Sequence, residues 1–210
     1  IIMKSLEDVL QNKKTDPKKF SQNYIKYLIG LLNKINYSKI AECIDKIEEA
    51  RINDKTIFIM GNGGSASTAS HVANDFGLAV LKKSKNPNLK SYRAQSITDN
   101  MSVISATAND SDYTNIFLDQ LKVHYRKGDI VILISASGNS KNLVEAAKWV
   151  RSNSGFVISW LGFDGGILKS NSDLNIIVNT PKGEYAPVED IHLIINHVIV
   201  SWMHYHISSL

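Results

Sequence analysis

The sequence predicts an α/β protein built around a parallel β-sheet. Short apolar runs alternate with longer segments of helical periodicity from Thr56 onward. The runs at 57–60 and 130–134 are apolar at every position, which is typical of strands covered on both faces. Strands that alternate with helices form parallel sheets, because a parallel crossover needs a connection long enough to hold a helix. We therefore expect a three-layer sandwich with a five-stranded parallel sheet, preceded by a helical N-terminal arm.

Residues 5–53 are expected to form two or three helices, because their apolar residues recur at helical spacing and Asp16–Pro17 is a helix-start signal. The apolar stripes consist of Ile25, Leu28, Ile29, Leu32 and Ile35, and of Ile40, Ile44 and Ile47. Asp45, Glu48 and Glu49 are expected to face away from the second stripe. The first stripe needs a cover, either the rest of the chain or a partner subunit. We take 1–55 as the arm and 56–210 as the sheet domain, together one structural unit.

The remaining elements follow in alternation. The expected strands are 57–60, 92–97, 130–134, 156–161 and 174–178. The expected helices are 65–81, 101–108, 116–125, 143–150 and 188–206.

Composition excludes several classes of protein. The 210 residues are 43% hydrophobic and 21% charged, so the chain is neither a disordered tail nor a coiled-coil rod. The net charge of +4 is spread along the chain, and no nucleic-acid partner is expected. No apolar stretch of about 18 residues indicates a membrane span, and we expect a cytoplasmic protein. A single cysteine, Cys43, excludes an intrachain disulfide and a cysteine-based zinc cluster.

Two turns rich in Gly, Ser and Asn follow the predicted strands at 57–60 and 130–134. The first is Gly61-Asn62-Gly63-Gly64-Ser65, and the second spans 135–140 with serines at 135, 137 and 140. Each leads directly into a predicted helix, and helix N-termini at the carboxyl ends of strands attract phosphate. Turn chemistry alone also favours these residue types. The recurrence of the pattern at two strand ends favours a phosphate site held by neutral donors.

A nucleotide is the weaker interpretation of these turns. Gly61, Gly63 and Ala66 match the dinucleotide fingerprint, but lysines stand where an acidic ribose ligand is expected. No Gly-Lys-Ser/Thr follows, which excludes a P-loop. We expect no nucleotide cofactor.

Five motifs occur in an order that resembles the sugar-isomerase (SIS) domain and, within it, the phosphoheptose isomerases. They are Gly61-Asn62-Gly63-Gly64-Ser65, Ala108-Asn109-Asp110, Ser135-x-Ser137-Gly138-Asn139-Ser140, Asp164-Gly165-Gly166 and Glu189-Asp190-Ile191-His192. The resemblance runs from about residue 20 to 206. It implies a flavodoxin-like fold and a homotetramer with active sites between subunits.

The resemblance also implies an activity, the isomerisation of sedoheptulose 7-phosphate to glycero-manno-heptose 7-phosphate through an enediol, for surface polysaccharide. By position, Asp75 is the base and His197 the general acid. His71, Asp75, Glu189 and His197 match positions that hold zinc in some relatives. The implied substrate-binding residues are Asn62, Gly63, Gly64, Ser65, Asp110, Ser135, Ser137, Ser140 and Glu189.

Several positions depart from the family pattern. The family commonly has Glu at the position of Asp75 and Gln at that of Glu189, and Ala186–Pro187 replaces an Asp-Arg pair. These changes leave open a different sugar phosphate. Glu189 and His197 are also about 80° apart around an ideal helix, whereas Asp190 aligns better with His197. A helix that begins only near Glu189 would relieve this misfit.

Two other classes of protein remain as alternatives. One is a non-catalytic SIS tetramer that binds a sugar phosphate or a protein such as a replication initiator. Retention of both His71 and His197 argues against it. The other is a sugar-sensing transcription regulator, but the residues before Thr56 contain no basic recognition helix.

Overall fold

The computed structural model describes residues 4–10, 16–83 and 86–209, and its centre is a five-stranded parallel sheet. The strand order is β2-β1-β3-β4-β5, which confirms the expected α/β class and is the order of flavodoxin-like sheets. The strands are β1 (Thr56–Gly61), β2 (Arg93–Ser96), β3 (Ile130–Ser135), β4 (Phe156–Gly162) and β5 (Leu174–Val178).

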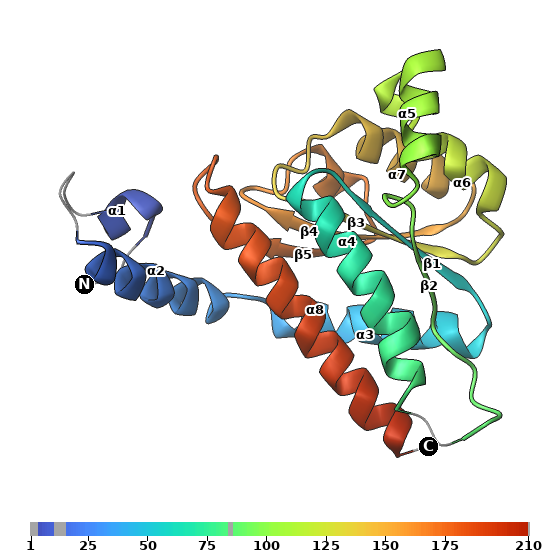
Figure 1. The fold of residues 1–210 in the computed structure, drawn as a ribbon, viewed down its shortest axis with the longest axis horizontal. Helices are drawn as coiled ribbons and strands as arrows, with labels where there is room; N and C mark the ends of the chain where they lie inside the picture. The colour runs from blue at the N-terminus through green and yellow to red at the C-terminus, as the bar shows by residue number, and fades with distance from the viewer. Residues whose placement is uncertain (1–3, 11–15, 84–85, 210) are drawn as a thin grey trace.

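Helices cover both faces of the sheet, giving three layers (Figure 1). The helices are α1 (Leu6–Leu10), α2 (Pro17–Leu32), α3 (Tyr37–Ile52), α4 (Gly64–Asn74), α5 (Met101–Asp110), α6 (Leu118–His124), α7 (Lys141–Ser152) and α8 (Tyr185–Ser208). Helical turns of other types are Asp75–Ala79, Tyr113–Asn115 and Ile167–Ser170. Within the described residues, no helix combines the length and the apolarity needed to cross a membrane.

Alternation along the strands assigns the helices to the two layers. Ile59 of β1 and Ile132 of β3 join one apolar cluster, together with residues of α3, α4 and α8. Their neighbours Phe58 and Val131 point to the opposite face and join a second cluster with α6 and α7. Both faces of the central strands β1 and β3 are therefore buried, as their uninterrupted apolar runs predicted.

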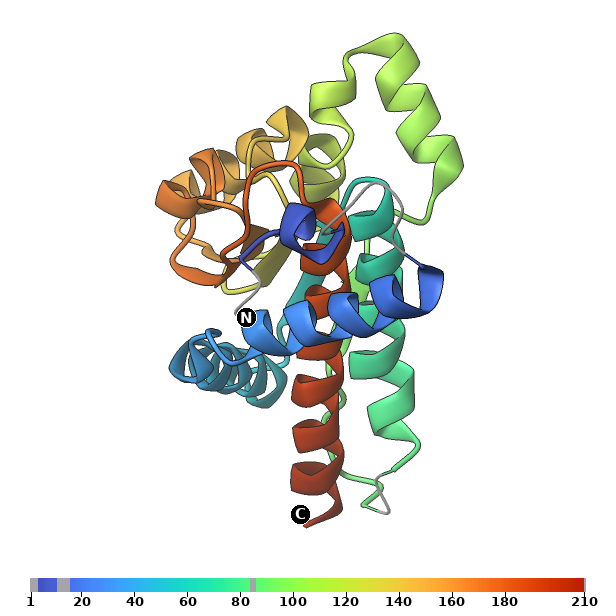
Figure 2. The same ribbon diagram turned by 90° about the vertical axis from the view of Figure 1, so that its left-hand side faces the viewer.

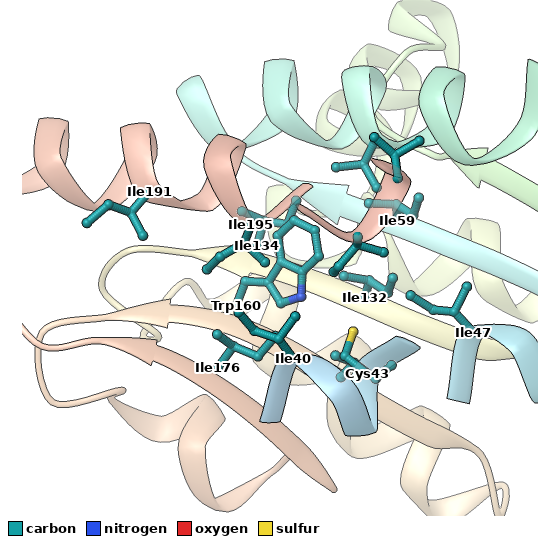
Figure 3. Close-up of a cluster of buried hydrophobic side chains, with 14 of the residues drawn as sticks. Ile40, Cys43, Ile47, Ile59, Ile132, Ile134, Trp160, Ile176, Ile191 and Ile195 are labelled. Carbon is teal, nitrogen blue, oxygen red and sulfur yellow. The ribbon is translucent and has the colours of Figure 1, made fainter. Parts of the chain in front are cut away.

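Trp160 of β4 lies at the centre of the first cluster, fully buried between α3 and α8 (Figure 3). Cys43 of α3 lies beside it and is also fully buried. Burial raises the pKa of the Cys43 thiol to about 12. A thiol that stays protonated is a poor nucleophile, so Cys43 is a packing residue.

The expected helix at 65–81 is divided into two kinds of helix. Regular α4 ends at Asn74, and a π-helical turn continues from Asp75 to Ala79. A π-turn inserts one extra residue per turn and is rarely visible in a hydropathy pattern. The closing helix begins at Tyr185, before the predicted residue 188, because Pro187 in its first turn has no N–H that would need a helical partner.

The chain itself covers only part of the N-terminal stripe. Leu28 and Ile35 are buried, whereas Ile25 and Ile29 are each more than half exposed. In Figure 2, α2 crosses in front of α8 and α4. The division of the chain at residue 55 stays a proposal, although α2 and α3 pack into the same cluster as the sheet.

The position of Glu48 opposite the second stripe predicted that this side chain faces solvent. That prediction is wrong, because the side chain is only 14% exposed. Its carboxylate binds Arg51 and accepts hydrogen bonds from Tyr92 Oη at 2.6 Å and His206 Nε2 at 3.3 Å. Burial opposes ionisation, but the hydrogen bonds from Arg51 and Tyr92 outweigh it and hold the pKa of Glu48 below its usual value. The carboxylate thus joins α3 to the C-terminal end of α8.

His192 on the inner face of α8 is completely buried. Its Nε2 lies 3.2 Å from the carbonyl oxygen of Leu161, which can only accept, so Nε2 carries the proton. Burial lowers the pKa of His192 to about 4, although the Leu161 carbonyl opposes the shift. The folded protein therefore holds this ring neutral at pH values where the unfolded chain would protonate it.

We predict that His192 makes the protein less stable as the pH falls from about 6.5 towards 4. The unfolded chain takes up a proton in this window and the folded chain does not, which costs up to about 3 kcal/mol near pH 4. Urea unfolding of the wild type and His192→Leu at pH 7 and pH 4.5 measures the difference. The variant should lose less stability between the two pH values, whereas His124→Gln, at an exposed position, should match the wild type. An unchanged loss in His192→Leu would contradict the assignment.

Candidate functional site

The two Gly/Ser turns meet at the carboxyl edge of the sheet. β1 and β3 are adjacent and parallel, with Gly61 paired to Ile134, so the turns that follow them lie side by side. They enclose a pocket of about 200 Å³. Its lining consists of Asn62, Ser65, Ile134, Ser135, Ala136, Ser137, Ser140, Tyr185 and Glu189.

Glycines allow the turns to approach other backbone closely. Gly63 has a φ of +55°, a left-handed conformation that starts α4. Gly138 has a φ of +63°, and a Cβ there would collide with the carbonyl of Gly165. Asn139 Oδ1 also accepts from the N–H of Ile167 at 3.0 Å. The Asp164-Gly165-Gly166 motif therefore shapes the second turn from outside.

The pocket presents hydroxyl groups and helix N-termini. Ser65 lies in the first turn of α4, and Ser140 precedes α7, so the positive ends of both helix dipoles face the pocket. Ser135 and Ser137 accept backbone N–H groups of their own turn at 3.1 and 3.3 Å, which leaves their O–H groups free to donate. Among the residues that the structure describes, no Lys or Arg lines the pocket. This arrangement suits an anion held by neutral donors.

Asn62 lines the pocket, but its amide is engaged with another side chain. It exchanges two hydrogen bonds with Asn142 of α7, at 3.0 and 2.9 Å, and its Oδ1 also accepts from Tyr113 Oη at 3.1 Å. The pair ties the first turn to the helix that follows the second. Sequence reasoning missed Asn142 and Tyr185, since neither belongs to a recognisable motif.

Asp110 does not line this pocket. It ends α5, which has no buried residue and projects from the body of the protein (Figure 1). Its Oδ1 accepts from Asn109 Nδ2 at 2.7 Å. Its expected part in substrate binding stays a prediction.

Glu189 lies in the serine pocket. Its carboxylate packs against Gly64 so closely that a Cβ on this glycine would collide with it. An acid at this point places a negative charge at the N-terminus of α4, where the helix dipole favours it. The same charge opposes a phosphate in the pocket.

A second cluster forms further along α4 and α8, which lie side by side (Figures 1 and 2). His71 Nε2 is 3.3 Å from Asp75 Oδ2, at the i, i+4 spacing seen in the sequence. His197 Nε2 of α8 is 3.9 Å from the same oxygen and 3.4 Å from His71 Nε2. The Asp75 side chain is 13% exposed, while those of His71 and His197 are 43% and 54% exposed.

Three of the four expected metal positions come together in this cluster. Ligand atoms of His71, Asp75 and His197 all lie within 4.8 Å of one another. Two imidazoles and a carboxylate are a suitable donor set for zinc, with one coordination position left for water or substrate.

Glu189 is separate from this cluster because α8 is helical from Tyr185 onward. In a regular helix, Glu189 and His197 are about 12 Å apart along the axis and about 80° apart around it. The start of the helix therefore does not relieve the misfit noted from the sequence. Asp190, which aligned better, accepts instead from Tyr24 Oη of α2 at 2.6 Å.

A larger pocket of about 540 Å³ opens at the opposite edge of the sheet. Its two lysines are already engaged, Lys46 with Glu49 at 2.6 Å and Lys55 with the carbonyl of Lys127 at 3.0 Å. In open α/β sheets, ligands bind at the carboxyl ends of the strands. We therefore place the functional site in the serine pocket and the His71–Asp75–His197 cluster.

Comparison with known proteins agrees with this fold. Residues 23–162 match the profile of the SIS domain family. The chain therefore belongs to the SIS domain proteins.

Individual relatives identify the family of the chain within the SIS domain proteins. A phosphoheptose isomerase of Leptospira biflexa is 35% identical over 148 residues, which are 70% of this chain and 73% of the relative. The phosphoheptose isomerase of Clostridium acetobutylicum is 32% identical over 161 residues, 77% of this chain and 79% of that protein. The solved phosphoheptose isomerase of Neisseria gonorrhoeae superposes with a TM-score of 0.79 at 25% identity, covering 90% of this chain and all of the other. Within the SIS proteins, the chain belongs to the phosphoheptose isomerase family.

We predict that Glu189→Gln binds inorganic phosphate more tightly than the wild type. Two like charges about 4 Å apart repel by about 1 kcal/mol even in water, so the affinity should rise at least about fivefold. Isothermal titration with phosphate measures it. Glu145→Gln removes the same charge from α7, where Glu145 pairs with Lys148 outside the pocket, and should change nothing. Equal or weaker binding by Glu189→Gln would show that its carboxylate does not face the bound anion.

Proposed function

We propose that the protein interconverts sedoheptulose 7-phosphate and the corresponding aldose, glycero-manno-heptose 7-phosphate, through an enediol. The observation that carries this proposal is the joint placement of a serine-lined anion pocket and an acid–base cluster along the same pair of helices. The cluster lies six to ten residues beyond Ser65 along α4, which is about 9–15 Å. This separation suits a sugar with its phosphate and its carbonyl at opposite ends of the carbon chain.

In this proposal the serine pocket holds the phosphate. The hydroxyls of Ser65, Ser135, Ser137 and Ser140 donate to its oxygens. The positive N-termini of α4 and α7 attract its negative charge. Gly63 and Gly64 let the backbone of the first turn approach the ligand. Glu189 accepts from hydroxyl groups of the sugar and orients it.

Asp75 acts as the base and His197 as the acid. Asp75 takes the proton from the carbon next to the ketose carbonyl, while His197 donates a proton to the carbonyl oxygen, which yields the enediol. Asp75 then returns its proton to the former carbonyl carbon. His197 recovers its proton from the hydroxyl of the adjacent carbon, which becomes the aldehyde. His71 contacts both residues and keeps them oriented.

The chain's own ligands for zinc would be His71, Asp75 and His197. With zinc bound, His197 would serve as a ligand instead of the proton donor, and the ion would supply a Lewis acid for the carbonyl and enediol oxygens. Glu189 is not included in this set, because it lies in the serine pocket.

We further propose that the protein is a cytoplasmic homotetramer with active sites between subunits. Apolar side chains on α8 and on the chain segment that continues α4 are exposed on the single chain: Leu78, Leu81, Val198, Trp202 and Tyr205. A groove of about 300 Å³ between α3 and α8 continues this surface. Exposed apolar patches of this kind mark association surfaces.

Turnover of sedoheptulose 7-phosphate, followed by NMR, tests the proposed reaction. Asp75→Asn and His197→Ala should each lower kcat by about 10²–10⁴-fold, the usual contribution of a positioned acid or base. His124→Gln, on the exposed face of α6, should retain full activity. A folded wild-type protein that binds the sugar but produces no aldose, with or without zinc, would favour the non-catalytic alternative.

Zinc binding gives a separate test of the cluster. Replacement of His71 or His197 by Ala should lower zinc affinity by more than about tenfold, since each removes one of three ligands. Glu189→Ala should leave zinc affinity unchanged. Competition with a fluorescent chelator measures all of these affinities, and a large loss in Glu189→Ala would restore the four-ligand site.

A further inference from the structure

Asn196 is a polar side chain on the buried face of α8, directly before His197. It is completely buried, and the neighbouring residues on that face, Ile195 and Ile199, belong to the apolar core. Its Nδ2 donates to Asp75 Oδ2 at 2.7 Å. Its Oδ1 is buried and has no partner within the described residues. An unpaired buried carbonyl costs about 1–3 kcal/mol, so stability does not explain this residue.

The contact fixes the orientation of the amide. An ionised carboxylate can only accept, so the NH₂ group and not the carbonyl must face Asp75. Within the described chain, this is the shortest contact of Oδ2, since His71 and His197 are at 3.3 and 3.9 Å. It is also the contact least exposed to solvent, because both histidines are about half exposed.

The two oxygens of Asp75 therefore have different environments. Oδ2 receives Asn196 and both histidines. Among the described residues, Oδ1 has one weak contact, 3.4 Å to Nδ2 of the exposed Asn74. A carboxylate anchored through one oxygen presents the other in a defined direction.

We propose that Asn196 is a positioning residue that anchors Asp75 Oδ2, so that Oδ1 is the oxygen that takes the substrate proton. This inference rests on the proposed function of Asp75 as the base. Asp75 begins the π-helical turn, where the regular pattern of α4 is interrupted, so the backbone alone does not set the carboxylate direction. The buried amide holds it from the α8 side.

Asn196→Leu tests the inference, because Leu fills a similar volume and removes both the donor and the unpaired carbonyl. A misdirected base slows the chemical step, so kcat should fall about 100-fold. KM should stay within about twofold, since the amide does not touch substrate. The melting temperature should not fall. Asn175→Leu is the matched control: Asn175 Oδ1 is also buried without a partner, but its Nδ2 donates to the carbonyl of Lys169. It should keep the wild-type kcat.

A double-mutant cycle separates positioning from a structural role. In the Asp75→Asn background, Asn196→Leu should change kcat by less than about twofold, because no base remains to be positioned. Losses that multiply would overturn the proposal, and so would an unchanged kcat in Asn196→Leu alone. If the wild type has no turnover, the proposed function fails separately. The crystal structure of Asn196→Leu then decides the anchoring: Oδ2 should leave its place beside His71, and an unmoved carboxylate refutes it.

Discussion

The packing of α4 against α8 is the constraint on which the site depends. Near the N-termini of the two helices, this packing brings the carboxylate of Glu189 against Gly64, beside the serine turns. Further along, the same contact brings Asn196 and His197 to Asp75. Neither helix holds a complete site, since the proposed base, Asp75, follows α4 in the π-helical turn, and α8 carries the proposed acid and the proposed anchor. Because the contact is made by buried apolar residues, the polar groups need only small adjustments to reach one another.

The parallel sheet supplies the other half of the geometry. β1 and β3 are paired with their ends level, so the turns after them form one pocket, and each turn opens directly into a helix. Gly61 permits the first turn because a Cβ there would lie 2.6 Å from the carbonyl oxygen of Ser65. Anion binding thus depends on the shape of the backbone and on hydroxyl groups. A positively charged side chain would bind anions less selectively, since it attracts every negative group in reach.

The charge of Glu189 and the anchoring of Asp75 both affect which ligand the site favours. A carboxylate in the pocket weakens the binding of inorganic phosphate. It favours a ligand that also offers hydroxyl groups to the carboxylate. Beyond it, the proposed base, Asp75, has a short side chain whose carboxylate is held by a buried amide. Both features favour a ligand that is recognised at two separated points.

Continuous apolar runs predicted β1 and β3, because a sheet covered on both faces requires them, and the alternation of strands with helical segments predicted the α/β class. The two serine turns were predicted from their Gly, Ser and Asn residues at the ends of these strands. The i, i+4 spacing likewise predicted that His71 and Asp75 share a face. The π-turn at Asp75, the inward orientation of Glu48 and the place of Glu189 in the pocket were decided only by tertiary packing. Asn196 is the clearest case, since in the sequence it is one polar residue in an apolar helix. Its role depends on which side chain of another helix lies opposite it, and local sequence carries no information about that distance.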